Sequence, residues 1–497
     1  MRDFLAQLPL VILLLGVTAL LSWLPATHAL ALGDHAAARA FFYPGLILLV
    51  LAMMLGLAMR DRPPTPHLEM ELGWLIGLWL VLPLFMAVPV KLAVPGASWL
   101  DAWFDMISAL TTTGASAFVP DDLPPSINLW RALIGWSGGL LTLVMIFAIL
   151  IPLNLGGGEV LFGRAAEHRA AAEEGASRRF GQQLVLILPL YAGFTLLLWV
   201  LLLIAGERGL PAVAHAMGTL STSGIRVETG PGTGGFAAEA IMLVFFILAL
   251  NRQFLRLDGG FRRQGWLRRD PEIRLGLGLI VLAGLVLTLA PLAAHLAAGT
   301  VETPGGLFRA FWGALFTAAS YLTTTGYDSV FWPEARGWTG PAIPAAAMIG
   351  LVMIGGGIGT LTGGVKLLRV YALYLHGRFE LERTIYPSVV SGEGMRRRQL
   401  VERSARPAWM FLMMFAITMI AVLFALTLTG ESFVHALVLA VSALTTTGQL
   451  ATNVLPPESG YATLAPAAKV ILGVAMVIGR LGILAVLAVI LSAIARR

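Results

Sequence analysis

The chain has 497 residues, a formal net charge of +6, 57% hydrophobic residues and only 12% charged residues. A soluble domain carries roughly a quarter of its residues as charged side chains, so this composition excludes a string of soluble domains. It predicts one polytopic, all-α membrane protein. The chain has no cysteine, which excludes disulfides, thiolate zinc sites, iron–sulfur clusters and cysteine nucleophiles.

A helix needs about 20 consecutive apolar residues to cross a bilayer. Taken in chain order, ten runs qualify, and the sixth is the weakest because Glu239 and Asn251 interrupt it. These runs are 8–31, 41–59, 71–93, 129–153, 184–205, 236–256, 273–298, 341–370, 407–430 and 467–495.

Four shorter apolar segments lie between these runs, and each is too short or too polar to cross. They are 98–110, 211–220, 307–322 and 432–444. Each one ends in a cluster of hydroxyl residues followed by glycine. We therefore expect half-helices that enter the membrane and stop.

The basic residues predict which side of the membrane each loop faces. If both termini and the linkers before 71, after 153, after 256 and after 370 share one side, that side holds 25 of the 34 Lys and Arg residues. Cytoplasmic loops carry the excess of these residues. This explains the positive charge without nucleic acid as a partner, and it predicts that both termini are cytoplasmic.

The first apolar run has an alternative interpretation as a cleaved signal peptide, with small residues at 26–29 for cleavage. The stretch from Leu8 to Leu24 is long for a signal core, and a second span follows closely. These two features favour a retained spanning helix.

One signature recurs four times, at starts separated by 110, 102 and 122 residues. Each copy follows a short apolar segment and precedes another span. The repeated unit is therefore span, half-helix, hydroxyl–glycine loop and span, and a fixed period of this kind predicts a repeat architecture around one axis. The four copies are Thr111-Thr112-Thr113-Gly114, Ser221-Thr222-Ser223-Gly224, Thr323-Thr324-Thr325-Gly326 and Thr445-Thr446-Thr447-Gly448.

The chemistry of these loops is that of a monovalent cation filter. Irregular backbone at membrane depth is tolerated only where it is buried or lines a cavity. Rings of carbonyl oxygens can replace the water shell of a dehydrated cation without a fixed negative charge. The half-helix before each loop directs the negative end of its dipole toward the same place. The alternative, four unrelated helix caps, does not explain why the loops are in register with the spans.

Ionisable residues near these loops have two interpretations. Asp105 and His215 lie nine residues before their loop glycines, His435 lies thirteen before its own, and Asp328 follows Gly326 by two. The carboxylates could attract cations from outside. The interpretation that we favour is helix capping and hydrogen bonding behind the loops.

Arg480 lies near the middle of the last apolar run, between Gly479 and Gly482. It is 16 residues from Arg496, which is too far to reach the membrane surface comfortably. A charge at that depth usually faces a cavity or a partner. We expect Arg480 to point into the pore below the filter and to oppose cations, and the alternative is an internal salt bridge between helices.

The run 341–370 contains a glycine-rich segment at 355–366, in which six of twelve residues are glycine. A phosphate-binding P-loop needs Gly-Lys followed by Ser or Thr, whereas Gly364 is followed by Val365 and then Lys366. The composition instead predicts a broken helix. Its middle would form a loop across the inner cavity, and this loop is a candidate gate.

Taken together, the four loops, the glycine-rich break and the Gly479-Arg480-Leu481-Gly482 segment resemble the Trk/Ktr/HKT superfamily of potassium transporters. The two extra N-terminal spans, the segment from Ile151 to Gly158 and the length are most similar to its bacterial TrkH-type pore subunits. The resemblance covers nearly the whole chain. It implies two N-terminal helices followed by four pseudo-symmetric helix, pore-helix, filter-loop and helix repeats.

The resemblance also assigns residues. It implies that the filter binds the transported K⁺ and that the loop at 355–364 is an intramembrane gate with Arg480 in the ion path. The implied K⁺ ligands are Thr112, Thr113, Gly114, Thr222, Ser223, Gly224, Thr324, Thr325, Gly326, Thr446, Thr447 and Gly448. The implied gate residues are Gly355, Gly356, Gly357, Gly359, Gly363, Gly364 and Arg480.

Further implications concern organisation and partners. The resemblance implies a homodimer in the bacterial inner membrane, a TrkA-like cytoplasmic ring that carries the nucleotide sites, and no organic cofactor on this chain. The expected units are an N-terminal domain and four pore repeats, at 1–70, 71–182, 183–272, 273–406 and 407–497. The sequence departs from the family pattern at Gly357 and Ile358, and at Arg226, a cation close to the second filter loop.

Other functions remain open beside K⁺ uptake. The first is a Na⁺-permeable or weakly selective cation pathway, although a glycine in all four loops favours K⁺. The second is a membrane enzyme, but no His-Glu-x-x-His or Gly-x-Ser-x-Gly motif is present and few ionisable residues lie within spans.

Overall fold

The structure is a computed structural model that describes residues 10–59, 68–150, 176–228, 232–250, 270–297, 304–333, 342–385, 395–456 and 460–483. Within these ranges all the regular structure is helical and there is no strand. The all-α fold class predicted from composition is confirmed. Three predicted features lie wholly or partly outside these ranges: the segment 151–158, the ends of the runs at 251–256 and 484–495, and both termini.

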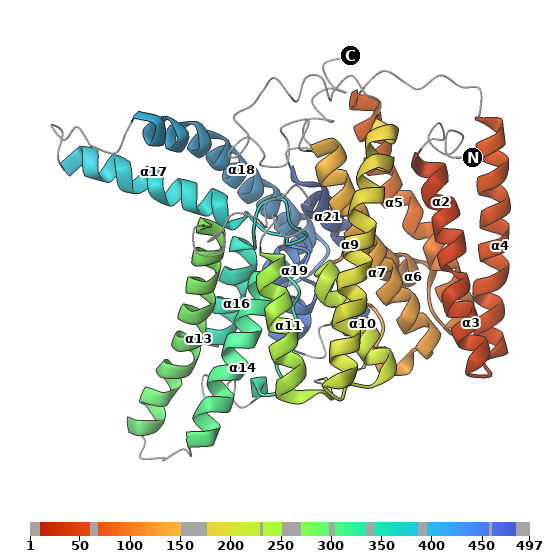
Figure 1. The fold of residues 1–497 in the computed structure, drawn as a ribbon, viewed down its shortest axis with the longest axis horizontal. Coiled ribbons are helices and arrows are strands. Elements are labelled where there is room, and N and C mark those ends of the chain that lie inside the picture. The colour runs from red at the N-terminus through yellow and green to blue at the C-terminus, as the bar shows by residue number, and fades with distance from the viewer. Residues whose placement is uncertain are drawn as a thin grey trace.

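The N-terminal part forms a hairpin at one edge of the bundle, in red in Figure 1. The first predicted span is two helices, α2 (Leu10–Leu21) and α3 (Trp23–Ala31), which are nearly continuous. The second is α4 (His35–Ala58), and the Asp34 side chain caps its start by accepting a hydrogen bond from the Ala37 backbone. This pair corresponds to the two extra spans that precede the repeats.

The rest of the bundle has four successive groups of a long helix, a short helix and a further helix. The first group is α5 (Leu68–Ala93), α6 (Trp99–Leu110) and α7 (Pro125–Met145), which continues as the single π-turn η2 (Ile146–Leu150). The second is α9 (Ala176–Ile204), α10 (Gly209–Ser221) and α11 (Gly235–Ala249); the third is α13 (Pro271–Ala297), α14 (Pro304–Leu322) and α16 (Ala342–Ile354). The fourth is α18 (Met395–Leu428), α19 (Phe433–Leu444) and α21 (Pro466–Leu481).

Equivalent helices in the first and fourth groups start in the same way. Ser98 and Ser432 precede the short helices α6 and α19, and each side chain accepts a hydrogen bond from the backbone N–H three residues on. Such N-caps satisfy donors that the first helical turn leaves free. Pro125 and Pro466 occupy the first positions of α7 and α21, where a missing N–H costs nothing.

Six helices are long and apolar enough to cross a membrane, judged by length and composition over the described residues. They fall at 10–31, 35–58, 125–148, 179–204, 271–289 and 405–428. Shorter apolar helices at 77–93, 235–247 and 344–354 coincide with three of the other predicted spans. The four predicted half-helices correspond to α6, α10, α14 and α19.

The predicted span at 341–370 is broken as its glycine content indicated. Helix α16 ends at Ile354, and α17 (Leu367–Ile385) begins only after the glycine-rich segment. Helix α17 continues beyond the apolar run into a charged stretch, where Arg378 and Glu382 form an exposed ion pair one turn apart. With the first part of α18 it projects from the bundle as a hairpin (Figure 1).

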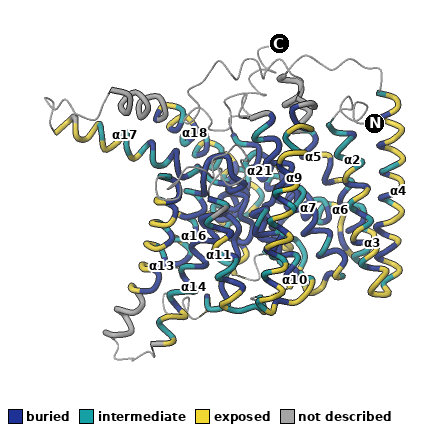
Figure 2. The backbone as a smooth tube through the Cα atoms, viewed as in Figure 1, coloured by how far each residue is buried: buried dark blue, intermediate teal, exposed yellow. Residues whose placement is uncertain are grey.

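The burial pattern places the short helices and their loops at the centre of the molecule. Figure 2 shows mostly dark blue, buried backbone in the middle of the molecule and exposed residues along α4 and α13 at the edges. The side chains of the four hydroxyl–glycine loops are almost fully buried. Exposed residues on the outer helices include large apolar side chains such as Ile47, Val185 and Ile417, as expected for helices that face lipid.

Glycine allows two of the outgoing helices to approach the ends of the short helices. A Cβ atom added at Gly138 of α7 would lie 1.9 Å from the carbonyl oxygen of Leu110, the last residue of α6. A Cβ atom added at Gly479 of α21 would lie 2.4 Å from the carbonyl oxygen of Leu444, the last residue of α19. The first and fourth groups therefore use the same contact, just before each loop begins.

We predict that Gly138→Ala destabilises the protein by about 1–3 kcal/mol, the usual cost of overpacking, because the new methyl group meets rigid backbone. Thermal unfolding in detergent would measure this as a lower Tm. Gly193→Ala is the matched control, since Gly193 is also within a long helix but its added Cβ atom would meet nothing within 4 Å. Equal Tm values for the two variants would contradict the close approach.

Candidate functional site

The four hydroxyl–glycine loops share one backbone hydrogen-bond pattern. In each loop the third residue donates its N–H to the carbonyl oxygen five residues earlier, inside the short helix. The donor and acceptor pairs are Thr113 and Ser108 (2.8 Å), Ser223 and Gly218 (3.0 Å), Thr325 and Ser320 (2.9 Å), and Thr447 and Ser442 (2.9 Å). The four loops therefore leave their helices in the same direction.

The central threonine of every loop has a left-handed backbone. Its φ is 54° at Thr112, 52° at Thr222, 57° at Thr324 and 53° at Thr446. A β-branched residue rarely adopts this conformation, and a strained residue persists only where its surroundings hold it. The sequence motif alone gave no sign of this strain, which all four loops share.

Side-chain hydroxyls hold the strained loops from behind. The first hydroxyl of each loop donates to a carbonyl four residues earlier in the short helix, as Thr111 does to Ile107 at 2.8 Å. The first and third hydroxyls of each loop also lie within hydrogen-bond distance of each other. These pairs are Thr111 and Thr113 (2.8 Å), Ser221 and Ser223 (2.9 Å), Thr323 and Thr325 (3.1 Å), and Thr445 and Thr447 (3.4 Å).

The loops contact one another in a closed cycle. A Cβ atom added at Gly114 would lie 2.1 Å from the Ser223 carbonyl oxygen, and one added at Gly224 would lie 1.9 Å from the Thr325 carbonyl oxygen. The third loop contacts the fourth, because a Cβ atom added at Gly326 would lie 3.3 Å from the Thr447 side chain.

The fourth loop closes the cycle by returning to the first. The Gly448 N–H donates to the Thr113 carbonyl oxygen at 2.6 Å. The four loops, which are up to 335 residues apart in the chain, therefore surround one common axis, and each contacts the next loop in sequence order. Their backbone carbonyls and hydroxyls are uncharged oxygens. Within the described residues, no group of three His, Asp or Glu side chains could hold a metal ion.

The central threonine hydroxyls lie at the level of the glycine-rich segment. The Thr222 Oγ1 donates to the Leu361 carbonyl oxygen at 3.3 Å, and the Thr324 Oγ1 accepts from the Gly363 N–H at 2.8 Å. The Oγ1 atoms of Thr112 and Thr446 are buried and have no partner among the described residues. One end of the ring of loops is therefore in contact with the segment at 355–366.

The glycine-rich segment is closely packed at three of the glycines that the sequence marked as a gate, at two of them against other parts of the chain and at one within the segment itself. A Cβ atom added at Gly363 would lie 1.9 Å from the Thr445 carbonyl oxygen, at the start of the fourth loop. Cβ atoms added at Gly355 and Gly357 would lie 2.1 Å from the carbonyl oxygens of Gly363 and Leu250. A side chain at any of these positions would require the backbone around it to shift.

Arg480 touches this segment directly. Its Nη1 donates to the Leu361 carbonyl oxygen at 2.5 Å, and its Nε donates to the Thr142 hydroxyl at 2.9 Å. Among the described residues no carboxylate pairs with Arg480, and its partners there are a hydroxyl and a carbonyl oxygen. The buried guanidinium connects α21 with both α7 and the glycine-rich segment.

Lys366 and Glu272 were not singled out from the sequence as parts of the site. Lys366 has a left-handed backbone (φ 85°), and its ammonium group donates to the carbonyl oxygen and the hydroxyl of Thr362. The Glu272 carboxylate accepts from the Ile358 N–H at 2.8 Å. Lys366, two residues after Gly364, is a signal in the sequence that could have marked this position, whereas nothing in the local pattern around Glu272 does so.

Most of the ionisable residues beside the loops are engaged behind them. Asp105 forms a buried ion pair with Arg131 at 3.0 Å, and the Glu207 carboxylate lies 2.7 Å from the His215 ring nitrogen. His435, in the first turn of α19 and at the other end of that helix from the loop, lies 3.8 Å from the carboxylate of Glu431, which precedes the helix. The pairs of Asp105 and His215 are of the kind expected for side chains that support the loops, and the His435 contact is not.

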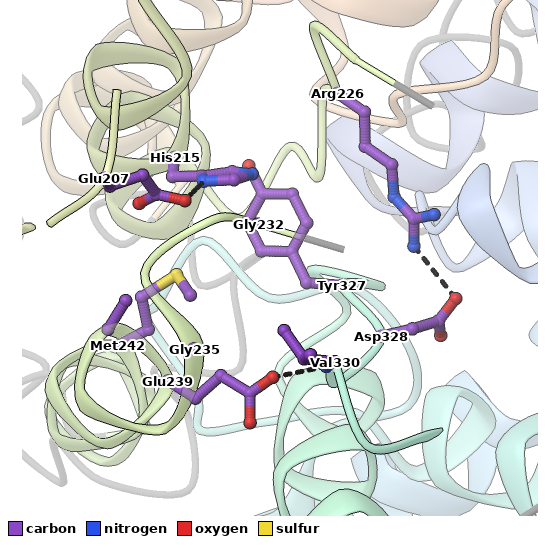
Figure 3. A pocket seen from close by; sticks show the side chains of 11 residues that line it. Glu207, His215, Arg226, Gly232, Gly235, Glu239, Met242, Tyr327, Asp328 and Val330 are labelled. Atoms are coloured by element: carbon purple, nitrogen blue, oxygen red, sulfur yellow. Dashed lines mark hydrogen bonds and ion pairs between the residues drawn. The ribbon is translucent and has the colours of Figure 1, made fainter. Parts of the chain in front are cut away.

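Arg226, the cation close to the second loop, is paired with a carboxylate. Its Nη2 forms an ion pair with Asp328 at 3.0 Å and donates to the Gly326 carbonyl oxygen at 3.3 Å, so it joins the second loop to the third. Figure 3 shows this pair at one side of a small pocket, opposite His215 and Glu207.

Glu239, which the sequence marked only as an interruption of an apolar run, also lines this pocket. Its carboxylate accepts from the Trp312 indole at 2.7 Å, from the Ser329 hydroxyl at 2.8 Å and from the Val330 backbone. It therefore fixes the chain that leaves the third loop.

The fourth loop departs from the other three at its glycine. Gly114, Gly224 and Gly326 have φ values of 76°, 58° and 83°, but Gly448 has φ −60° and immediately precedes the short helix α20 (Gln449–Val454). The Thr447 carbonyl accepts from Ser442, and the Gly448 carbonyl accepts from Tyr461. The expectation of four equivalent loops therefore holds for the backbone of their central threonines and fails at the last glycine.

Comparison with known proteins agrees with this architecture. Residues 39–249 and 281–494 match the family model of TrkH, described as a cation transport protein. The TrkI potassium uptake protein of Halomonas elongata is 30% identical over 82% of this chain and 80% of its own length. The TrkH potassium uptake protein of Salmonella typhimurium is 28% identical over 93% of both chains.

A solved structure is similar over almost the whole fold. The crystal structure of the potassium transporter TrkH from Vibrio parahaemolyticus superposes with a TM-score of 0.78, covers 98% of both chains and is 25% identical in sequence. The match of the family model to most of the sequence, together with the four-loop fold, leads to one conclusion. The chain belongs to the TrkH family of cation transport proteins.

Proposed function

We propose that this protein takes up K⁺ across the bacterial inner membrane through the ring of four loops. The observation that carries the proposal is the closed cycle of loops, each with a left-handed central threonine and with uncharged oxygens buried around one line. The ligands would be the residues of loop positions two to four, which are Thr112, Thr113, Gly114, Thr222, Ser223, Gly224, Thr324, Thr325, Gly326, Thr446, Thr447 and Gly448.

The physical case rests on the absence of fixed negative charge in the ring. A carboxylate would favour divalent ions, whereas a set of neutral oxygens can replace the hydration shell of a monovalent ion and still release it. The four short helices end at the ring, so their dipoles add negative potential there. Relatives with the names of potassium uptake proteins support K⁺ as the ion.

The gate in this proposal is the glycine-rich segment, which Arg480 holds in place through its hydrogen bond to the Leu361 carbonyl oxygen. The glycines of the gate are Gly355, Gly356, Gly357, Gly359, Gly363 and Gly364. In the conformation described here the segment contacts two central threonines. An ion that leaves the ring on this side would meet the segment and two cationic side chains, Lys366 and Arg480. Uptake therefore requires the segment to move.

The organisation that we propose follows the family. The units are an N-terminal domain and four pore repeats, at 1–70, 71–182, 183–272, 273–406 and 407–497. The chain would form a homodimer with cytoplasmic termini and bind a TrkA-like nucleotide-binding ring on the cytoplasmic side. The projecting hairpin of α17 and α18 (Figure 1) is a surface of this chain that such a partner could contact to move the adjoining gate segment.

A weakly selective or Na⁺-permeable pathway is the alternative that one observation favours. Two carbonyls of the fourth loop accept hydrogen bonds from Ser442 and Tyr461. If these carbonyls stay engaged, the ring offers fewer oxygens to the ion than four equivalent loops would. Discrimination between K⁺ and Na⁺ would then be lower.

We predict that proteoliposomes containing the protein take up ⁸⁶Rb⁺ and that K⁺ competes at concentrations about tenfold or more below those of Na⁺, as for a carbonyl filter. Gly224→Ala should reduce uptake about tenfold or more, because its Cβ atom would lie 1.9 Å from the Thr325 carbonyl oxygen and the position has positive φ.

Gly96→Ala is the control for this variant. Gly96 also has positive φ (78°), but its added Cβ atom would meet nothing within 4 Å. Its uptake should equal that of the wild type. Equal competition by Na⁺ would contradict K⁺ selectivity, and undiminished uptake by folded Gly224→Ala protein would contradict the location of the filter.

We predict that Arg480→Ala raises ⁸⁶Rb⁺ uptake about tenfold in the absence of a cytoplasmic partner, since it removes both a buried positive charge and the bond to Leu361. Arg480→Lys is the matched variant, because it keeps the charge but cannot hold Thr142 and Leu361 together. If the lysine variant takes up more Rb⁺ than the wild type but less than the alanine variant, both the positive charge and the hydrogen bonds of Arg480 contribute to closure. Unchanged or lower uptake by a folded alanine variant would contradict a role in closure.

A further inference from the structure

Gln449 follows the fourth loop directly and begins the short helix α20. It is the first side chain after the loop glycine, and it is 7% exposed although it is polar. A buried amide must find hydrogen-bond partners, or its desolvation destabilises the fold. The partners of Gln449 lie in other repeats of the chain.

The Gln449 side chain reaches across the ring of loops. Its Nε2 donates to the Gly114 carbonyl oxygen at 3.1 Å and to the Gly224 carbonyl oxygen at 3.0 Å. Its Cγ would lie 3.4 Å from a Cβ atom added at Gly326. One side chain from the fourth repeat thus contacts the glycines of all three other repeats.

The ring of glycine carbonyls is therefore occupied by donors. Gly114 and Gly224 accept from Gln449, Gly326 accepts from Arg226, and Gly448 accepts from Tyr461. Arg226 is held by its ion pair with Asp328, and the partners of the Tyr461 hydroxyl, the Gly448 carbonyl oxygen and the Ser442 hydroxyl, both belong to the fourth repeat. Gln449 is the one of these donors that bonds to the glycine carbonyls of two repeats at once.

The NH₂ group of the amide can take the place of a cation at the carbonyl oxygens. Its two N–H bonds present positive charge to carbonyl oxygens, as a dehydrated K⁺ would, and no net charge is buried. Because one nitrogen lies within 3.1 Å of both the Gly114 and the Gly224 carbonyl oxygens, an ion that bridged these two oxygens would have to displace it. After rotation, the amide oxygen could instead face the ion as a further ligand.

We propose that the Gln449 side chain occupies the glycine ring of the filter and competes with the transported cation for its carbonyls. The ring is at the opposite end of the loops from the glycine-rich segment, so the filter is closed by an exchangeable side chain at one end and by the gate at the other. The proposal rests on the proposed function, because it takes the four loops as the ion filter.

The test compares ⁸⁶Rb⁺ uptake into proteoliposomes by the wild type and by Gln449→Ala and Gln449→Glu, all confirmed as folded by thermal unfolding. Loss of two neutral hydrogen bonds should lower the half-saturating Rb⁺ concentration of Gln449→Ala about tenfold. Gln449→Glu should lower it further, because a carboxylate cannot donate to the carbonyls and its oxygens attract the ion. Asn453→Asp is the matched control, since this amide is on the same short helix but donates to the Tyr321 hydroxyl.

The outcomes separate this inference from the proposed function. If the wild type and Asn453→Asp agree and both Gln449 variants saturate at lower Rb⁺, the proposal holds. If the wild type transports Rb⁺ and both variants saturate at the wild-type concentration, or both lose uptake while folded, Gln449 does not compete with the ion and the filter assignment stands. If the wild type takes up no Rb⁺, the proposed function itself is wrong.

Discussion

The structure depends on keeping the backbone oxygens of four irregular loops directed toward one axis deep inside an apolar bundle. Four threonines adopt a left-handed backbone there, at positions 112, 222, 324 and 446. Each is held by the same hydrogen bond from the next residue back into its short helix, and by hydroxyls behind the loop. The strain persists because each loop is fixed by its own helix and packs against its neighbours in the cycle.

Close packing and polarity reinforce each other around this ring. Gly138 and Gly479 let the outgoing helices reach the carbonyls at which α6 and α19 end, so the bundle closes around the loops. The charged residues nearby are paired behind the ring, as Asp105 is with Arg131. The oxygens that remain inside the ring are therefore neutral, which suits a monovalent ion that has to bind and leave.

In the described conformation both ends of the ring are in contact with protein groups. The glycine-rich segment bonds to Thr222 and Thr324 at one end, and the Gln449 amide bonds to two glycine carbonyls at the other. The Arg480 guanidinium connects the segment to α7 and α21. A movement of the segment would thus be transmitted directly to the threonine hydroxyls of the second and third loops.

The sequence by itself determined the all-helical membrane architecture, the four half-helices with their loops and the break before Lys366, because hydropathy, glycine content and a repeated motif are local properties. Only the tertiary structure decided that the loops close into a cycle, that Gly448 departs from its three counterparts, and that Gln449 and Glu272 join the site. These features depend on contacts between residues as many as 335 positions apart. Local pattern carries no information about such contacts, since a hydrogen-bond partner across the ring is chosen by packing.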